Sequence, residues 1–383
     1  MKIKLEPNKR RSLMTKVEEI HPNHVYFNVP EGYKVLVKLG DEVKKNTILA
    51  TSEKNTSIVS SVAGKVTGCD KVIKIDNNHS EAKETFDVSN IDRKKFVRLL
   101  KDSGIIGMGG GGFPTYKKYM LERIDTLIVN AVECEPFLTA DYTIVKLHAE
   151  EIVECLKQIK EINNIKKVVI AVKKDNNDID EFFKPYLTKD ITLKQIDGFY
   201  PSGWERKLVK DVLNVTYNKY PSEKNIVVNN VSTIFAIKRL LDGKRLDARM
   251  VTVTGDIDSS NYLVKIGTSA YHLIRDIDTE NKYVIIGGPM MGKIYKDEYI
   301  TPTTNCILVI KKNKFKESPC IRCGKCVQAC PARLEPVLLK DNLDNPEKLK
   351  KLNIQKCMEC GLCSYVCPAT IDLRNKIAEA KRR

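Results

Sequence analysis

A cysteine pattern occurs twice near the C-terminus of this chain, and it predicts the kind of metal site that this region forms. In each run, two residues separate the first three cysteines, three residues precede the fourth, and a proline follows. This spacing is typical of thiolates that bind four-iron clusters. The first run is Cys320, Cys323, Cys326 and Cys330 before Pro331, and the second is Cys357, Cys360, Cys363 and Cys367 before Pro368.

In such paired runs, the fourth cysteine binds the cluster of the other run. We expect Gly324 and Gly361 to lie in tight turns near sulfur, and the fourth cysteine to start a short helix. A zinc ribbon is the alternative, but it uses two cysteine pairs for each metal and needs no trailing Cys-Pro. The sequence therefore predicts two [4Fe-4S] clusters, one on Cys320, Cys323, Cys326 and Cys367, the other on Cys357, Cys360, Cys363 and Cys330.

The rest of the composition is that of an ordinary globular protein of 383 residues. No apolar run approaches the ~20 residues of a membrane-spanning helix, and the N-terminal segment lacks a secretory apolar stretch, so we expect a cytoplasmic protein. The formal net charge of +16 suggests nucleic acid, a membrane surface or an acidic partner. Two clusters and one FMN would lower it to about +10. Since long Lys/Arg runs are absent and there is one Trp, nucleic acid is disfavoured.

Turn-flanked β-type runs dominate the first part of the chain. Residues Leu39–Val43 and Ser60–Val66 resemble the two halves of a biotinyl/lipoyl-type barrel-sandwich module. Such modules carry their cofactor on a hairpin lysine, and Lys54 is the nearest candidate. It lacks the usual neighbours, so a degenerate structural module is the favoured interpretation. We expect this module over 31–88, after an N-terminal extension over 1–30.

Strands and helices then alternate, which indicates an α/β sheet with functional loops at the carboxyl ends of its strands. The expected strands are Thr126–Asn130, Lys167–Lys173 and Asn225–Val228, with helices over Lys146–Lys160 and Val231–Leu241, in a domain over 89–243.

Short strands around glycine-rich turns follow, as in a small SLBB-like β-grasp module over 244–310. The expected strands are Met250–Thr254, Tyr262–Ile266 and Tyr283–Ile286. The two-cluster, ferredoxin-like α segment then occupies 311–383. The predicted fold is thus a multidomain α/β chain.

Four consecutive glycines, Gly109 to Gly112, follow the helical segment Lys94–Leu100 and lead into Phe113-Pro114-Thr115. Such a run permits positive φ, close approach of a ligand, and a phosphate cradle of backbone N–H groups. A flexible loop is the alternative, which the ordered Phe-Pro-Thr exit opposes. The run also departs from the Rossmann motif, because no strand directly precedes it.

Two further strings follow expected strands. The string Asn130-Ala131-Val132-Glu133-Cys134-Glu135-Pro136 places two carboxylates at a strand end, where they suit a surface loop or bonds to a flavin or ribose. Asn229 and Asn230 precede the helix that contains Thr233, so they either cap that helix or bind a ligand.

Together, these strings resemble the FMN- and NADH-binding subunit of respiratory complex I. That protein ends with a single cluster, and the chain from about Ile20 to Ala380 looks more like the C subunit of the Rnf ferredoxin:NAD⁺ oxidoreductase complex. The resemblance implies nicotinamide-nucleotide contacts at Phe113 and Glu135. It implies further cofactor contacts at Gly107, Gly109, Gly110, Gly112, Lys118, Asn130, Glu133, Tyr200, Gly203, Glu205, Asn229, Asn230 and Thr233.

The chain departs from these families at several positions. Val132 stands where the complex I pattern has aspartate, and Cys134 where it has a small residue. Ala140 replaces the lysine of a lysine–aspartate pair, and Glu19 stands where the Rnf family has glycine. These departures affect the expected NADH contacts more than the flavin contacts.

The resemblance implies an NADH-dependent oxidoreductase with noncovalent FMN. The flavin accepts two electrons as a hydride and releases them one at a time through two clusters. The cofactors carry the chemistry, so no catalytic acid or base is expected. The implied partners are membrane subunits of an ion-translocating complex or a ferredoxin-like acceptor, with peripheral attachment to the cytoplasmic side of the membrane. The alternatives are a soluble NADH-dependent donor to a cytosolic reductase and a non-catalytic electron-transfer adaptor. Ser364, Tyr365 and the tail 381–383 are candidates for the partner contact.

Overall fold

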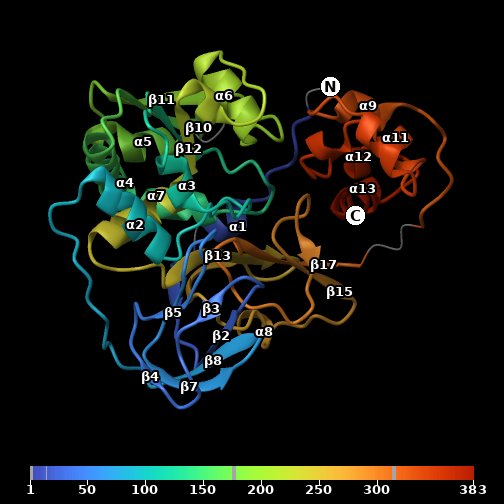
Figure 1. Ribbon diagram of the computed structural model, residues 1–383. Helices are drawn as coiled ribbons and strands as arrows, with labels where there is room; N and C mark the ends of the chain where they lie inside the picture. The colour runs from blue at the N-terminus through green and yellow to red at the C-terminus, as the bar shows by residue number, and fades with distance from the viewer. Residues whose placement is uncertain (1–2, 14, 175–177, 313–315) are drawn as a thin grey trace.

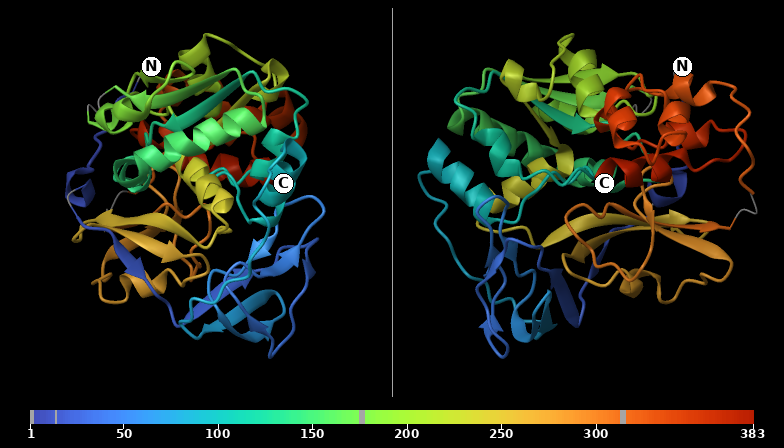
Figure 2. Two further views of the ribbon diagram at one scale, coloured as in Figure 1. Left: turned by 90° about the vertical axis from the view of Figure 1, so that its left-hand side faces the viewer. Right: turned by 45° about the vertical axis from the view of Figure 1, so that its right-hand side comes forward.

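The computed structural model describes residues 3–383 except 14, 175–177 and 313–315. An α/β domain occupies the upper part of Figure 1, and two β parts lie below it. The C-terminal helices form a separate group beside the α/β domain, and both views of Figure 2 keep them against it. No helix in the described ranges has the length and hydropathy needed to span a membrane.

The α/β domain is built on a four-stranded parallel sheet in the order β11-β10-β9-β12. Its strands are β9 (Thr126–Ala131), β10 (Lys167–Lys173), β11 (Ile191–Ile196) and β12 (Ile226–Asn230). Its helices are α2 (Arg93–Asp102), α3 (Thr115–Tyr119), α4 (Ala140–Ile162), α5 (Ile179–Phe183), α6 (Glu205–Leu213) and α7 (Val231–Leu241). The bounds predicted for β10 and α7 are confirmed.

Both faces of this sheet are covered, because alternate residues of a strand point to opposite sides. Leu127 and Val129 of β9 belong to the large core beneath α4 and α7. Ile128, between them, belongs to a second core with Leu208 and Val209 of α6. The result is a strand that is apolar at nearly every position, as buried parallel strands are.

The order of the strands reverses at β9, and we call the region outside the carboxyl ends of β9 and β12 the crevice. The chain passes from β9 to β10 and β11 on one side, and then returns to place β12 on the other side of β9. Ligands of open α/β sheets bind outside the carboxyl ends of strands at such a reversal. Asn130 and Ala131 end β9, and Asn229 and Asn230 end β12. The topology therefore predicts that these residues lie at a ligand-binding site.

A six-stranded mixed sheet lies beneath the α/β domain, in the order β1-β14-β13-β17-β15-β16. Its first strand comes from the N-terminal segment and pairs in parallel with β14. A short helix, α8 (Tyr271–Ile274), follows β14. The strands are β1 (Glu18–Ile20), β13 (Ala248–Gly255), β14 (Ser260–Lys265), β15 (Lys282–Ile286), β16 (Lys293–Ile294) and β17 (Cys306–Lys311).

Two small sheets, β2-β8-β7-β4 and β3-β5-β6, form the remaining β part. Strand β2 lies within the segment 1–30 and pairs with β8. Lys54 is exposed in a bend between β5 and β6. The strands are β2 (His24–Asn28), β3 (Lys34–Val35), β4 (Glu42–Val43), β5 (Ile48–Thr51), β6 (Ile58–Val59), β7 (Gly64–Cys69) and β8 (Val72–Asn77).

Short helices around a small core form the C-terminal domain. They are α9 (Lys325–Ala329), α10 (Pro336–Lys340), α11 (Pro346–Lys351), α12 (Leu362–Tyr365) and α13 (Leu373–Arg382). Gly324 and Gly361 precede α9 and α12 with φ of 73° and 80°, a conformation that favours glycine.

The prediction that the fourth cysteine starts a helix is wrong. Cys330 lies at the end of α9 with extended backbone angles, and Cys367 lies beyond the end of α12. A proline follows each of them, and the residue before proline is excluded from the helical region by the proline ring. The third cysteine of each run, Cys326 or Cys363, is the one inside the short helix.

Candidate functional site

The glycine loop lies between α2 and α3, so no strand precedes it, as predicted. The N–H of Gly107 donates to Phe113 O at 2.8 Å, which closes the loop on itself. Gly110 and Gly112 have φ of 103° and 62°, and a Cβ at Gly110 or Gly111 would meet no atom within 4 Å. The loop therefore presents exposed backbone to open space.

Asn230 connects this loop to α7 and α4. Its Oδ1 accepts from the N–H of Ser232 at 3.0 Å and so caps α7, while its Nδ2 donates to Asp141 Oδ2 at 2.6 Å. A Cβ at Gly109 would lie 3.2 Å from Asn230 Cβ. The N–H of Met108 also donates to Thr233 Oγ1 at 3.0 Å. The capping role that the sequence left open is thus present for Asn230.

The other predicted flavin-side residues converge on the same strand ends. Asn130 Nδ2 donates to Gly203 O at 2.9 Å. Lys118 Nζ lies 2.6 Å from Val228 O and 3.3 Å from Glu205 Oε2. Asn229 is buried and donates to the hydroxyl of Tyr119 at 2.6 Å. The crevice outside β9 and β12 thus gathers residues from the glycine loop, α3, α6 and both strand ends.

Glu133 is occupied by the protein itself. Its oxygens accept from the N–H groups of Asp141 and Tyr142 at the start of α4, and Lys9 Nζ lies 3.4 Å from Oε2. Both members of this ion pair are buried. Burial first, and then the neighbouring charge of Glu133, raise the pKa of Asp141 to about 6. Lys9 was not predicted, because nothing in the sequence places the N-terminal segment beneath this loop.

Glu135 contacts the loop between β15 and β16 of the six-stranded sheet. Its Oε1 accepts from the N–H groups of Met290 and Met291 at 2.8 and 2.9 Å. Its Oε2 lies 3.2 Å from the hydroxyl of Tyr200, which donates to Cys360 O at 2.8 Å. Burial raises the pKa of Glu135. Oε1 therefore joins the α/β domain to the six-stranded sheet, whereas Oε2 contacts a tyrosine of its own domain that bonds to the C-terminal domain.

The loop 287–292 is the part of this junction that sequence reasoning missed. A Cβ at Gly288 would lie 2.1 Å from Glu135 Cγ, and one at Gly361 would lie 2.5 Å from Met290 O. Arg374 of α13 donates to Met291 O and Gly292 O at 2.6 and 2.8 Å. An apolar cluster fills the interface between these contacts; its buried members are Leu5, Tyr200, Met290, Ala329, Cys360 and Leu362.

The eight motif cysteines line two cavities. The walls of the first contain Cys330, Cys357, Cys360 and Cys363, and those of the second contain Cys320, Cys323, Cys326 and Cys367. These are the two crossed sets that the spacing predicts. In the described ranges, no three His, Cys, Asp or Glu side chains close around a point where one metal ion could sit. Each set gathers four thiols around one cavity, which we call a cage, and four thiols are the ligand number of a four-iron cluster.

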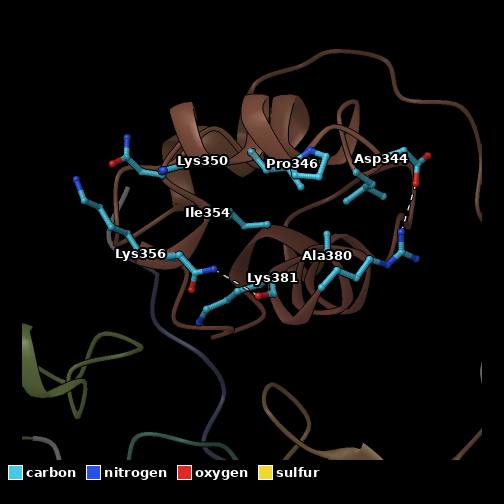
Figure 3. Close-up of a pocket in the computed structure, with 12 residues that line it drawn as sticks. Asp344, Pro346, Lys350, Ile354, Lys356, Ala380 and Lys381 are labelled. Atoms are coloured by element: carbon cyan, nitrogen blue, oxygen red, sulfur yellow. Dashed lines mark hydrogen bonds and ion pairs between the residues drawn. The ribbon is translucent and has the colours of Figure 1, made fainter.

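The two cages differ in exposure, and we call the more buried one, which contains Cys360, the inner cage and the other the outer cage. Cys360 is 7% exposed at the domain junction, whereas Cys320 and Cys323 are exposed. Another hollow of the C-terminal domain, drawn in Figure 3, contains none of the predicted site residues. Its rim carries Lys350 and Lys356, and Arg383 pairs with Asp344 across it at 3.3 Å.

Comparison with known proteins identifies the families to which the chain is similar. The Nuo51 FMN-binding domain family matches residues 100–239, and the 4Fe-4S dicluster domain family matches residues 312–371. The chain is 36% identical over 282 residues to the C subunit of the ion-translocating oxidoreductase complex of Buchnera aphidicola subsp. Baizongia pistaciae, covering 68% of this chain and 56% of that protein. The predicted resemblance to the Rnf C subunit is confirmed. The corresponding protein of Serratia proteamaculans is 32% identical over 342 residues, covering 80% of this chain and 48% of that protein.

This chain thus spans about half the length of those two relatives. Its fold is also similar to a chain of an NAD⁺-reducing [NiFe]-hydrogenase in the air-oxidised state, with a TM-score of 0.56 and 15% identity, covering 75% of this chain and 60% of that one. The predicted multidomain α/β organisation is confirmed, as are FMN and iron–sulfur clusters as the cofactors of the two matched domains.

The residues of the crevice fit FMN. The glycine loop offers exposed N–H groups beside open space, where a phosphate can be cradled. At the exit of the loop, the buried hydroxyl of Thr115 has no hydrogen-bond partner in the described part of the chain. A buried hydroxyl without a partner is costly unless a ligand supplies one.

Proposed function

We propose that this chain is the NADH-interacting FMN and iron–sulfur subunit of an Rnf-type ion-translocating oxidoreductase complex. The observation that supports the proposal is the Glu135–Tyr200–Cys360 junction, in which Tyr200 bonds the FMN-binding domain to Cys360 of one thiol cage. When bound, FMN exchanges a hydride with NADH and the clusters carry single electrons. The protein supplies orientation and electrostatics.

Each crevice residue has an assigned task in this proposal. The N–H groups of Gly109 and Gly110 cradle the phosphate, while Gly107 and Gly112 shape the loop through their own backbone bonds to Phe113 O and Gly107 O. Thr233 holds the loop from α7. Lys118 brings a positive charge to the strand ends, beside Glu205. The residues assigned to orienting the flavin are Asn130, Glu133, Tyr200, Gly203, Asn229 and Asn230.

We assign the nicotinamide nucleotide to the outer side of the glycine loop. Phe113 is 43% exposed there, and Lys118 Nζ lies 5.9 Å from the centre of its ring. An exposed aromatic ring beside a cation suits a planar, anionic nucleotide. A direct contact between NADH and Glu135 requires release of the bonds from Met290 and Met291, so we propose that Glu135 acts mainly through that loop.

We assign the outer cage to electron transfer with the partner, because it is the more exposed of the two. Cys320 and Cys323 reach the surface, and Ile321 between them is 69% exposed. A ferredoxin-like protein or a membrane protein of the complex docking here excludes water from an apolar residue next to the cage. The residues that the sequence nominated differ from this: Ser364 Oγ accepts from Arg374 N, and Arg382 pairs with Glu359.

The finer module names are part of the proposal. We infer that the two small sheets form the barrel-sandwich module, which β2 extends into the segment 1–30. The six-stranded sheet with α8 would be the SLBB-like β-grasp module over 244–310, between the FMN domain over 89–243 and the ferredoxin-type domain over 311–383. Strand β1 then joins the N-terminal segment to the β-grasp module.

Anaerobic purification followed by addition of NADH tests the proposal. We expect noncovalent FMN, about eight irons per chain as two four-iron clusters require, and bleaching of both chromophores by NADH. A soluble NADH-dependent donor would give the same spectra but work without membranes, so acceptor assays with and without native membranes separate the two. A non-catalytic adaptor would show clusters that NADH does not reduce, and that result would sink the proposal.

A further inference from the structure

Arg249, on β13 of the six-stranded sheet, is a fully buried cation beneath the FMN crevice. It is 2% exposed. Its guanidinium donates to three backbone carbonyls: Nε to Met250 O at 3.0 Å, and Nη1 to Pro302 O and, at 3.5 Å, to Met108 O. Met108 lies between Gly107 and Gly109, so Arg249 supports the glycine loop from the side opposite its open face.

The charge of Arg249 has no direct counterion in the described part of the protein. Its Nη2 atom is buried without a hydrogen-bond partner. Asp141 and Glu133 are the nearby acids that stabilise the charged form of Arg249. The oxygens of Asp141 accept from Asn230 and Ser232, and those of Glu133 accept from the start of α4 and face Lys9. Both acids therefore bond to groups other than Arg249.

Burial of an unpaired charge is strongly unfavourable unless another group compensates it. The glycine loop that Arg249 supports is the expected cradle of a phosphate. The N-terminus of α7, which contributes Thr233 to the loop, also favours negative charge. The positive charge beneath the loop and the helix terminus beside it thus act on the same position.

We propose that Arg249 is a further cofactor-binding residue, whose buried positive charge favours the phosphate group of FMN over an uncharged flavin end. This inference rests on the proposed function, because it requires FMN in the crevice. It adds a residue from the six-stranded sheet to a site otherwise built from the α/β domain. The packing of that sheet under the glycine loop would then bring the charge of Arg249 to the phosphate site.

Riboflavin, which lacks the phosphate, is the probe that isolates this effect. The experiment titrates flavin-depleted protein with FMN and with riboflavin, following quenching of flavin fluorescence, for the native chain, Arg249→Gln and Arg249→Lys. Arg249→Gln keeps hydrogen-bond donors without the charge, and Arg249→Lys keeps the charge. We expect Arg249→Gln to lose about tenfold in affinity for FMN, the ratio that corresponds to about 1.4 kcal/mol of electrostatic attraction, while riboflavin affinity stays within about twofold. Arg249→Lys should retain most of the preference.

Arg245→Gln is the matched control. Arg245 is also buried, at 7% exposure, but its guanidinium bonds to Asn46 O and lies 4.5 Å from the centre of the Phe86 ring, away from the crevice. Its variant should keep the native preference for FMN. An Arg249→Gln variant that loses both flavins equally, or neither, overturns the inference even if native protein binds FMN. Native protein that binds neither flavin would overturn the proposed function as well.

Discussion

The hydroxyl of Tyr200 lies 2.8 Å from the carbonyl oxygen of Cys360 and 3.2 Å from Glu135 Oε2. A hydroxyl has one hydrogen, so the shorter contact identifies Cys360 as the acceptor. This bond joins the FMN-binding domain to a ligand of the inner thiol cage across 160 residues of sequence. The bond of Tyr200 therefore helps to fix the relative position of the two cofactor sites, together with the contacts of Arg374 and the apolar cluster at the junction.

Tyr200→Phe should loosen this junction. Removing the hydroxyl leaves Cys360 O without its donor in a buried interface, which costs about 1–3 kcal/mol. We expect a lower denaturation midpoint for the C-terminal domain and slower reduction of the clusters by NADH. Chemical denaturation and stopped-flow absorbance measure the two effects. Tyr220→Phe, at a residue 52% exposed, is the control and should change neither. Equal cluster reduction rates in both variants would contradict the prediction.

Cys330→Ser tests the crossed ligands. Cys330 lines the cavity of Cys357, Cys360 and Cys363, not that of its neighbours in sequence. We expect the variant to keep about one four-iron cluster, with loss of the inner one, because three thiolates hold a cluster less firmly than four. Iron and sulfide analysis with electron paramagnetic resonance of the reduced protein distinguishes the clusters. Cys367→Ser is the reciprocal variant and should lose the outer cluster; the opposite assignment would show that the runs are not crossed.

Gly109→Val should abolish FMN binding in a protein that still folds. A Cβ at this position already lies 3.2 Å from Asn230 Cβ, so a branched side chain must displace Asn230 or fill the space for the phosphate. Flavin content after purification and a fluorescence titration measure the loss. Gly68→Val is the matched control, since its Cβ would lie 3.2 Å from Lys74 Cβ in the small β part, outside the FMN domain. Normal flavin content in Gly109→Val would move the phosphate away from the loop.

Asp141 predicts a pH effect. Burial raises the pKa of Asp141 to about 6 in the folded chain, from an ordinary value of 3.8. The folded state then binds the proton more tightly than the unfolded state, so this group makes the protein less stable as pH rises through that window. Between pH 5 and 6, which lies between the unfolded and folded pKa values, Asp141→Asn should flatten the decline in the free energy of unfolding, as measured by urea denaturation at each pH.

Asp247 supplies the control of opposite sign. It is also buried, but the charges of Arg239 and Lys265 hold the pKa of Asp247 below its ordinary value against burial. Its ionised form stabilises the fold above the unfolded pKa, and that stability is lost only as pH falls below it. Asp247→Asn should therefore lower the free energy of unfolding at pH 7 without changing its slope between pH 5 and 6. A native slope in Asp141→Asn would refute the assignment.

Local patterns in the sequence were sufficient for the parts of the site that are local in structure. The crossed cysteine sets follow from spacing, and β10 and α7 follow from runs of apolar residues. The contacts that join the domains were not predictable, because each links residues far apart along the chain. Lys9 meets Glu133 across 124 residues, and Glu135 meets Met290 across 155. A lysine near the chain start and a Met-Met pair in a glycine-rich turn carry no signal of these partners.

Ile321 is the residue at which we expect the partner to make its apolar contact. It is 69% exposed between two exposed cysteines of the outer cage, whereas Tyr365, at 59%, lies on α12 beside the inner run. An apolar residue at the rim of a redox site gains most from burial against a partner, about 1.5–3 kcal/mol for a side chain of this size. Ile321→Ser should therefore slow electron delivery to native membranes about tenfold, the ratio that corresponds to about 1.4 kcal/mol. NADH-dependent reduction of the protein's own clusters should not change. Tyr365→Ser is the control and should have little effect.

Salt separates the apolar from the electrostatic part of that contact. The formal charge of +16 favours attraction to an acidic partner, which screening weakens over about 10 Å at 0.1 M salt. Fractionation of native cells should thus find the native chain with membranes at low salt and released at high salt. Ile321→Ser should be released at lower salt than the native chain, because it keeps the charge and loses the apolar contact. Recovery of the native chain wholly in the soluble fraction at low salt, with full NADH-dependent reduction of a soluble acceptor, would exclude membrane docking and favour the soluble donor.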